Sequence, residues 1–122
     1  MSIGPTEFQD LVRERLPEFS GLLYAHVAEW GRGNMNALLI AAILEEVSAQ
    51  SKGELSSAHP SSLLRRTFDF MEYVMANGDD NVRSLVEVEF VEGLARKDFI
   101  DLNLQKRLGP LGQIKWMRLR RE

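Results

Sequence analysis

The sequence predicts a small all-α domain, a single-domain bundle of about five to six helices that contains antiparallel helical hairpins and is helical-repeat-like. Apolar residues recur at helical spacing along most of the 122-residue chain. Residues that start and stop helices separate these segments from one another. A chain of this length is large enough for one hydrophobic core, so residues 1–122 are expected to form one domain.

The stretch from Pro60 to Leu94 gives the clearest signal, because it holds two helix-length apolar patterns joined by a turn. In the first pattern, one arc of the predicted helix is apolar apart from a threonine. Its members are Leu63, Leu64, Thr67, Phe68, Phe70, Met71, Val74 and Met75. The Asn77-Gly78 pair then accepts the left-handed conformation that ends a helix, and Asp79 or Asp80 can cap the next one. These features predict a two-helix hairpin.

The second helix of the hairpin has an ambiguous period. One helical face collects the apolar residues at positions 82, 85, 86, 90 and 94. Glu89 projects onto that same face, and the apolar residues from Val86 to Phe90 also alternate with Glu87 and Glu89 as they would in a strand. The capping residues before this segment favour a helix. In a helix, Glu89 must lie at the rim or find a partner, because an unpaired buried carboxylate is costly.

Two helices are predicted near the N-terminus. The first begins at Pro5, a residue that suits the first helical turn, and continues with a one-sided apolar stripe until Pro17 interrupts it. The second is short, covers residues 22–30 and is closed by Gly31-Arg32-Gly33.

The third predicted helix forms the centre of the core. Asn34 is its expected N-cap, and its apolar residues up to Val47 point in almost every direction, as in a helix enclosed by others. Residues 48–62 are rich in serine and are predicted to be a loop. After the hairpin, residues 98–108 are expected to form another helix that ends at a Gly-Pro pair. The final segment, 111–122, is either a short helix or a basic tail.

Charge is distributed unevenly along the chain. The net charge is −3, yet Leu104 to Glu122 contains six cations against one acid, so the rest of the chain carries −8. A surface of one sign steers partners of the opposite sign. The acidic body is therefore suited to a basic protein surface.

Composition excludes several classes of protein. The absence of cysteine excludes disulfide scaffolds and thiolate metal sites, and it is compatible with the cytoplasmic location that we expect. The N-terminus lacks the pattern of a secretory signal. The longest wholly apolar run, Ala37–Leu44, is far shorter than a bilayer span, so we expect no membrane association.

No motif indicates catalysis. His26 and His59 lie outside any known metal-ligand spacing, and phosphate-binding and nucleophile-elbow motifs are missing. Carboxylates are the only abundant reactive groups, but Asp79 and Asp80 are better explained as helix caps and most others as a solvated face. We therefore expect no enzyme activity, catalytic residue, metal or cofactor.

The C-terminal half carries three short motifs in a fixed order. Phe68–Glu72 reads FxFxE, Gly78–Val82 reads GDxxV and Phe90–Leu94 reads FxExL, with a closing LGP at residues 108–110 and a looser LPEF at residues 16–19. This order resembles a group of small bacterial helical domains of unknown function. Members of that group are similar to immunity proteins encoded beside polymorphic or contact-dependent toxins.

The resemblance implies a non-enzymatic inhibitor that binds and blocks a cognate protein toxin with a basic surface. It supplies no catalytic residue to carry over, and the alternation around residues 86–89 departs from the more apolar helix that is usual in the group. The expected partner-binding residues combine acids and exposed aromatics: Trp30, Glu72, Tyr73, Asp79, Asp80 and Glu87.

The basic C-terminus supports an alternative function. Cations mixed with an aromatic side chain are typical of nucleic-acid binders. The residues concerned are Lys115, Trp116, Arg118, Arg120 and Arg121. A nucleic-acid-associated regulator or adaptor is therefore the second hypothesis. Nucleic acid is the less favoured partner, because the chain as a whole is acidic and no known nucleic-acid-binding module is present.

Overall fold

Helices account for the regular structure in the computed structural model, which describes residues 2–54, 62–96 and 104–121. The prediction of an all-α fold is confirmed. The α-helices are α1 (Pro5–Arg15), α2 (Ser20–Trp30), α3 (Asn36–Glu54), α4 (Ser62–Asn77), α5 (Asp80–Leu85) and α6 (Pro110–Arg121). A π-helix, η2 (Val86–Val91), continues α5, and the short 3₁₀ helices are η1 (Pro17–Phe19), η3 (Glu92–Ala95) and η5 (Leu104–Arg107).

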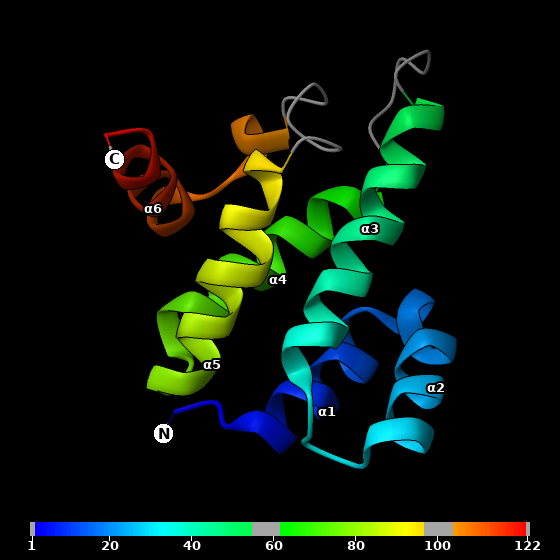
Figure 1. Cartoon of the computed structure of the whole chain (residues 1–122). Helices are drawn as coiled ribbons and strands as arrows, with labels where there is room; N and C mark the ends of the chain where they lie inside the picture. Colours follow the sequence, from blue (N-terminus) through cyan, green and yellow to red (C-terminus); the bar gives the residue numbers. More distant parts are fainter. Residues whose placement is uncertain (1, 55–61, 97–103, 122) are drawn as a thin grey trace.

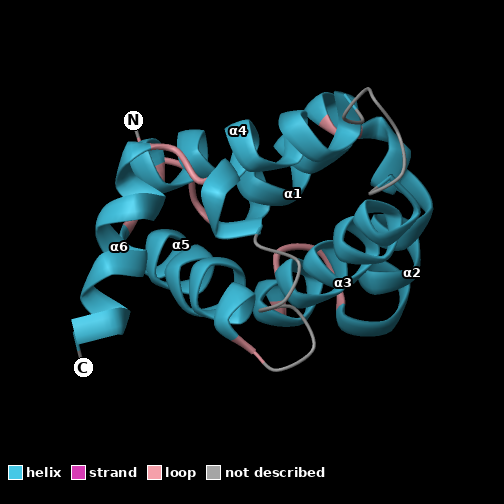
Figure 2. Cartoon of the chain, turned by 90° about the horizontal axis from the view of Figure 1, so that it is seen from above, coloured by secondary structure: helices cyan, strands magenta, loops and turns pink. Residues whose placement is uncertain are grey.

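The helices surround one core to which α1, α3, α4 and η2 contribute the largest side chains. Helix α3 and the continuous run α5–η2–η3 pack against each other, and α4 packs against both (Figure 1). Helices α2 and α6 lie on opposite sides of the molecule in both views (Figures 1 and 2). Within the described ranges, none of the helices is long and apolar enough to cross a membrane.

The predicted turn between the two hairpin helices is present and Asp79 caps the second helix, but the left-handed conformation predicted for Asn77-Gly78 is wrong, because neither residue has a positive φ. Oδ1 of Asp79 accepts a hydrogen bond from the backbone N–H of Val82 at 2.8 Å, which caps α5. A Cβ at Gly78 would lie 2.7 Å from the carbonyl oxygen of Val74, so only glycine fits there. The backbone of Ile3 pairs with both sides of the turn, bonding to Asn77 and Asp79 at 2.8 and 2.9 Å. These two hydrogen bonds therefore fix the N-terminal segment against the hairpin turn.

The segment with the ambiguous period is a helix with a wide turn. In a regular α-helix, a four-residue step moves an apolar stripe about 40° around the axis. The backbone N–H of Glu92 instead bonds to the carbonyl of Glu87, five residues back, and this wider turn reduces the drift. Every fourth residue from Val82 to Leu94 is buried as a result. Glu89 is only partly buried, and its carboxylate pairs with the guanidinium of Arg96 at 3.3 Å. Its charge therefore has the partner that was expected if this segment is a helix.

The structure corrects the start of the third helix. Asn34 does not cap it, because α3 begins at Asn36 and the N–H of Leu39 bonds to the carbonyl of Met35. The side chain of Asn34 donates to the carbonyl of Trp30 at 3.0 Å and so closes α2. Met35 has a φ of 54°, which turns the chain sharply between the two helices.

Two other boundaries also differ from the predictions. Helix α3 continues to Glu54, so the predicted loop at 48–62 starts too early, because serine and glutamine are tolerated in helices. Residues 55–61 lie outside the described residues. Of the helix expected at 98–108, only the 3₁₀ turn η5 falls within the described residues. The final segment forms α6, so the helical alternative holds over Pro110–Arg121.

A buried polar contact fixes α1 to the start of α3. Nε2 of Gln9 donates to Oδ1 of Asn36 at 2.7 Å, and Oε1 of Gln9 accepts the backbone N–H of Gly33 at 2.9 Å. Nδ2 of Asn36 donates in turn to the carbonyl of Pro5 at 3.0 Å. Both side chains are buried, so the hydrogen bonds satisfy groups that water cannot reach.

Replacing Gln9→Ala should lower the free energy of unfolding by about 2 kcal/mol, because the substitution leaves the buried side-chain oxygen of Asn36 and the partly buried N–H of Gly33 unpaired. Urea denaturation measures this loss. The matched control is Glu14→Ala, an exposed position on the same helix, which should change stability by less than about 0.5 kcal/mol. Equal effects from the two substitutions would contradict a structural role for the buried contact.

Helix α6 is held by a carboxylate from α4. Oε1 of Glu72 accepts the backbone N–H of Leu111 at 2.6 Å, and Oε2 accepts that of Gly112 at 3.1 Å. These are donors at the helix N-terminus, where a negative charge also meets the positive end of the helix dipole. A Cβ at Gly109 would lie 2.7 Å from the Glu72 side chain, so glycine allows this close approach.

Replacing Glu72→Ala should therefore lower stability by about 1 kcal/mol and loosen α6, because two charge-assisted hydrogen bonds to the helix end are lost. Hydrogen exchange of the α6 amides, together with urea denaturation, measures the effect. Asp69→Ala is the control, since Asp69 is exposed on the same helix and makes no hydrogen bond to the described residues. Unchanged exchange in the Glu72 variant would refute the capping role.

Candidate functional site

The six residues predicted to bind a partner do not form one surface. Trp30 ends α2, Asp79 is the N-cap before α5, and the other four lie on α4, α5 and η2. Glu72 and Asp79 are already occupied by helix ends, as described above. The remaining three are Tyr73, Asp80 and Glu87.

These three residues differ in how available they are. The ring of Tyr73 lies under the guanidinium of Arg15, with 4.2 Å from Cζ to the ring centroid. Asp80 is exposed in the first turn of α5. Glu87 is half-buried beside α6. Within the described part of the chain, the side chains of Asp80, Trp30 and Glu87 make no hydrogen bond, ion pair or ring contact, and of these three Asp80 and Trp30 are exposed.

Helix α2 presents an apolar outer side. Its eleven residues, SGLLYAHVAEW, include one ionised side chain, Glu29, and only Leu23 is buried. The exposed side, which we call the α2 face, consists of Gly21, Tyr24, Ala25 and Ala28. Tyr24 is 79% exposed, which is unusual for a large aromatic residue. A helix with so few polar residues normally buries more than one side chain.

A groove of about 520 Å³ lies next to this face, between α1 and α2. Leu23 and Val27 form apolar parts of its lining. The full lining, which we call the α1–α2 groove, is Gln9, Asp10, Arg13, Ser20, Gly21, Leu23, Tyr24, Val27 and Arg32. Asp10 and Arg32 pair at 2.9 Å between the two helices. The groove has the size of a small-ligand site or a pocket for a partner's side chain.

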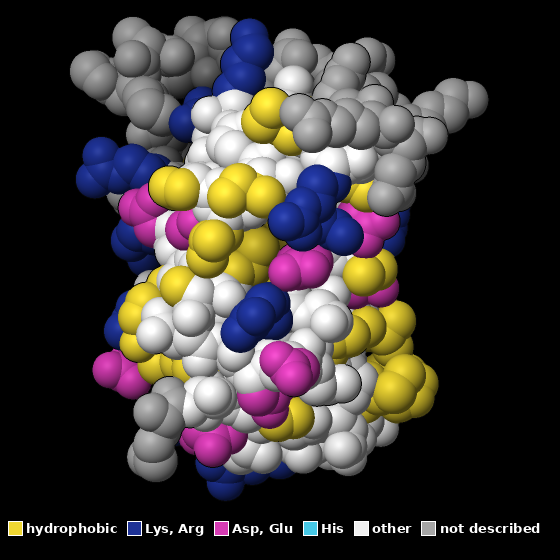
Figure 3. Space-filling model, turned by 90° about the vertical axis from the view of Figure 1, so that its left-hand side faces the viewer, with side chains coloured by type: hydrophobic (Ala, Val, Ile, Leu, Met, Phe, Trp, Pro, Cys, Tyr) yellow, Lys and Arg dark blue, Asp and Glu magenta, His cyan; other side chains and the backbone are white. Residues whose placement is uncertain are grey.

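A second groove, of about 370 Å³, lies between the α5–η2 run and α6. Its lining, which we call the α5–α6 groove, is Met75, Ala76, Arg83, Glu87, Leu111, Ile114, Lys115 and Arg118. Figure 3 looks onto this side of the molecule and shows hydrophobic and basic side chains next to each other. The groove therefore combines apolar contact area with positive charge.

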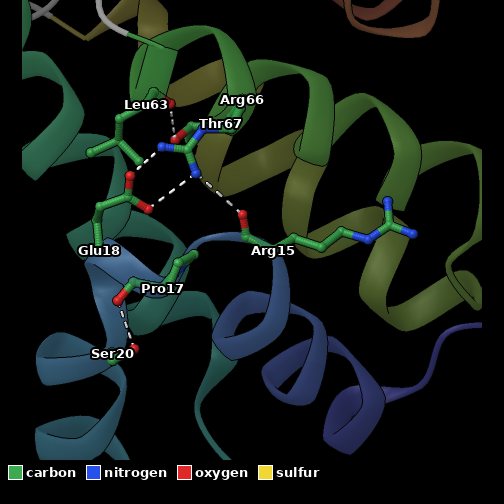
Figure 4. Close-up of polar contacts among 7 residues, drawn as sticks. All are labelled: Arg15, Pro17, Glu18, Ser20, Leu63, Arg66 and Thr67. Atoms are coloured by element: carbon green, nitrogen blue, oxygen red, sulfur yellow. Dashed lines mark hydrogen bonds and ion pairs between the residues drawn. The ribbon is translucent and has the colours of Figure 1, made fainter.

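Two side chains with shifted pKa values, Glu18 of η1 and Arg66 of α4, form an ion pair. Arg66 donates to both carboxylate oxygens of Glu18 and to the carbonyl of Arg15 at 3.4 Å (Figure 4). Its hydrogen bonds hold the pKa of Glu18 below the ordinary value, and Glu18 raises the pKa of Arg66 in return. The pair is on the surface and joins two elements, so its role is structural. Among residues 2–54, 62–96 and 104–121, no three His, Asp or Glu side chains converge to hold a metal.

Sequence reasoning missed both grooves. The polar-poor composition of α2 was a usable signal, because a surface helix normally alternates polar and apolar sides. The α5–α6 groove had no local signal, since its lining joins the hairpin of α4 and α5–η2 to α6, which follows much later in the chain.

One family of protein domains, described as "Domain of unknown function (DUF7674)", matches residues 10–122. The chain belongs to this family. The match includes almost all of the described fold, with both grooves except Gln9. Comparisons with curated proteins and with solved structures gave no match. The surfaces of this DUF7674 member are therefore the features that can indicate its function.

Replacing Glu18→Gln should reduce stability more at pH 7 than at pH 3. The folded-state pKa of Glu18 is depressed, so the pair contributes stability above the ordinary pKa of about 4.3 and loses it as pH falls through the lowered folded-state value. Urea denaturation at the two pH values measures the difference. Glu14→Gln is the control, since Glu14 is an exposed acid on α1 that forms no ion pair with the described residues, and it should change stability by less than about 0.5 kcal/mol. A Glu18→Gln effect of equal size at both pH values would contradict the ion-pair account.

Proposed function

We propose that this protein is a non-enzymatic immunity protein of the cytoplasm, which binds a cognate protein toxin with a basic surface and blocks it by steric and electrostatic occlusion. The observation that carries this proposal is the α2 face with its adjoining α1–α2 groove. It is an exposed surface of small residues around one aromatic side chain, Tyr24, beside a groove that the described part of the fold leaves open.

The composition of this surface suits a protein interface. Aromatic residues are enriched at interface centres, and Tyr24 and Trp30 both stand on α2. A groove next to an exposed tyrosine can receive a side chain from the partner while the tyrosine covers it. Arg13 and the Asp10–Arg32 pair supply polar contacts in the groove lining.

The groove is also preorganised. Gln9 lies in its lining and is held by hydrogen bonds to Asn36 and Gly33, so α1 cannot shift freely relative to α3. A surface that is already in place loses less conformational entropy when it binds. Tight inhibition by a small domain benefits from such rigidity.

The net charge of the body favours encounter with a basic partner, whereas the lining of the α1–α2 groove itself holds two cations, Arg13 and Arg32, against one acid, Asp10. The chain outside Leu104–Glu122 carries a net charge of −8. Exposed acids, including Glu14 on α1 and Glu29 on α2, lie on the same two helices as the groove. An acidic body accelerates encounter with a basic partner even when individual acids lie outside the contact area.

The nucleic-acid alternative has weaker support. Trp116, the aromatic residue that would stack on a base, is 6% exposed and packs into the core. The outer side of α6 instead exposes the aliphatic residues Leu111, Ile114 and Met117. Nucleic-acid binding does not explain those residues.

Position Gly21 allows a sharp test, because a Cβ there would meet no atom within 4 Å. Gly21→Trp should leave the free protein folded but obstruct the groove. Co-expressed with the toxin domain encoded beside its gene, this variant should lose protection of the cell and bind the purified toxin at least about tenfold more weakly. Tyr24→Ala should weaken binding in the same direction. Growth assays and isothermal titration calorimetry measure the two effects.

The matched control is Gly21→Ala, which adds helix propensity without bulk and should retain protection. Full protection by Gly21→Trp would exclude the α1–α2 groove as the toxin site. Failure of the wild-type protein to bind or neutralise any toxin encoded beside its gene would overturn the immunity function itself.

A further inference from the structure

Three cationic side chains and one acidic side chain line the α5–α6 groove. Arg83 comes from α5, and Lys115 and Arg118 come from α6. None of them has an ion-pair partner within 4 Å among the described residues. Glu87 is the only acid in the lining, so the groove carries an excess of positive charge on a chain that is acidic overall. Such a local excess favours an anionic occupant.

The same groove has an apolar lining that continues onto the outer side of α6. Met75, Leu111 and Ile114 line it, and Ile114 is 50% exposed. Met117, one turn further along α6, is 55% exposed. Large aliphatic side chains at this exposure contribute little to folding, but they can bury apolar area against a partner.

We propose that the α5–α6 groove binds an acidic, amphipathic helical segment of a partner protein. The segment's apolar side chains enter between η2 and α6, and its carboxylates pair with Arg83, Lys115 and Arg118. A helix in a groove between two helices is a common mode of peptide recognition, with anchors at helical spacing. A groove of about 370 Å³ has room for one or two large side chains.

The observations favour a polypeptide over the other anionic classes. A nucleic-acid strand offers phosphates for the cations but no aliphatic side chains for Leu111, Ile114 and Met117. An anionic membrane offers apolar contact, but the groove is concave and places Glu87 among the cations, where it would face lipid headgroups of the same sign. A peptide can place carboxylates beside the cations and an apolar residue beside Glu87.

This surface is independent of the α2 face. Helices α2 and α6 lie on opposite sides of the molecule, so one partner can occupy each side (Figures 1 and 2). The inference goes beyond the proposed toxin inhibition and does not depend on it. Its test needs no toxin, so the two proposals can fail separately.

The test uses the full chain and a fluorescein-labelled synthetic peptide with leucines at helical spacing and glutamates between them. Fluorescence anisotropy should show binding to this peptide and much weaker binding to a scrambled peptide of the same composition. Lys115→Glu and Arg118→Glu should each weaken binding by about tenfold. Glu87→Gln should strengthen it by about threefold, because the substitution removes the only negative charge from the lining at constant side-chain size.

Arg107→Glu is the matched control, since it makes the same charge change at an exposed position on η5 outside the groove lining, and it should weaken binding far less. Circular dichroism confirms that each variant is folded. Equal binding of the scrambled peptide, or equal loss from Arg107→Glu, would refute a specific groove. Tighter groove-dependent binding to a DNA oligonucleotide or to phosphatidylserine-containing vesicles, with none to the peptide, would also overturn the proposal. If a charge-reversal variant fails to fold, the test rests on Glu87→Gln, which is nearly isosteric. Unchanged peptide binding by that variant would then refute the proposal.

Discussion

The edge-to-face contact between Phe68 of α4 and Phe90 of η2 is the packing constraint on which both surfaces depend. The ring centroids are 5.0 Å apart, and Phe90 is fully buried. The wide turn of η2 keeps Phe90 directed into the core, which seats η2 against α3 and α4. With η2 fixed in this way, Glu87 is left on the side that meets α6. Helix α3, packed on η2, in turn carries the anchor for α1 at Asn36.

The fold could be predicted from sequence where the signals were local. The cap at Asp79, the glycine at the hairpin turn and the arc of α4 all depend on residues within one or two helical turns. The conflict in period around Glu89 was also local, and its cause is the π-helix, which neither an α-helical nor a strand template describes. The Glu89–Arg96 pair gives the carboxylate the partner that a helix at this position was expected to need. The irregular spacing of apolar residues in this capped segment therefore indicated an irregular helix, here the π-helix η2.

The roles of individual polar residues could not be predicted, because their partners are distant in sequence. Glu72 looked like a free surface acid, yet its partners are backbone N–H groups 39 and 40 residues further along the chain. Gln9 looked like an ordinary helix residue, and its partner Asn36 is 27 residues away. Sequence spacing identifies which residues share a helix face, but tertiary packing decides which carboxylates remain available to a partner. Asp80 and Trp30 remain available, whereas Glu72 and Asp79 are occupied.

Packing explains some of the glycines in this chain but does not explain Gly21. A Cβ at Gly78, Gly93 or Gly109 would lie 2.6–2.7 Å from a neighbouring atom, so packing accounts for those three residues. A Cβ at Gly21, the second residue of α2, would meet nothing within 4 Å, so packing does not account for this glycine. The described fold therefore provides no reason for Gly21, which lies on the α2 face and lines the α1–α2 groove. A bulky side chain at this position would close the groove beside Tyr24, whereas the single methyl group of alanine would leave most of it open.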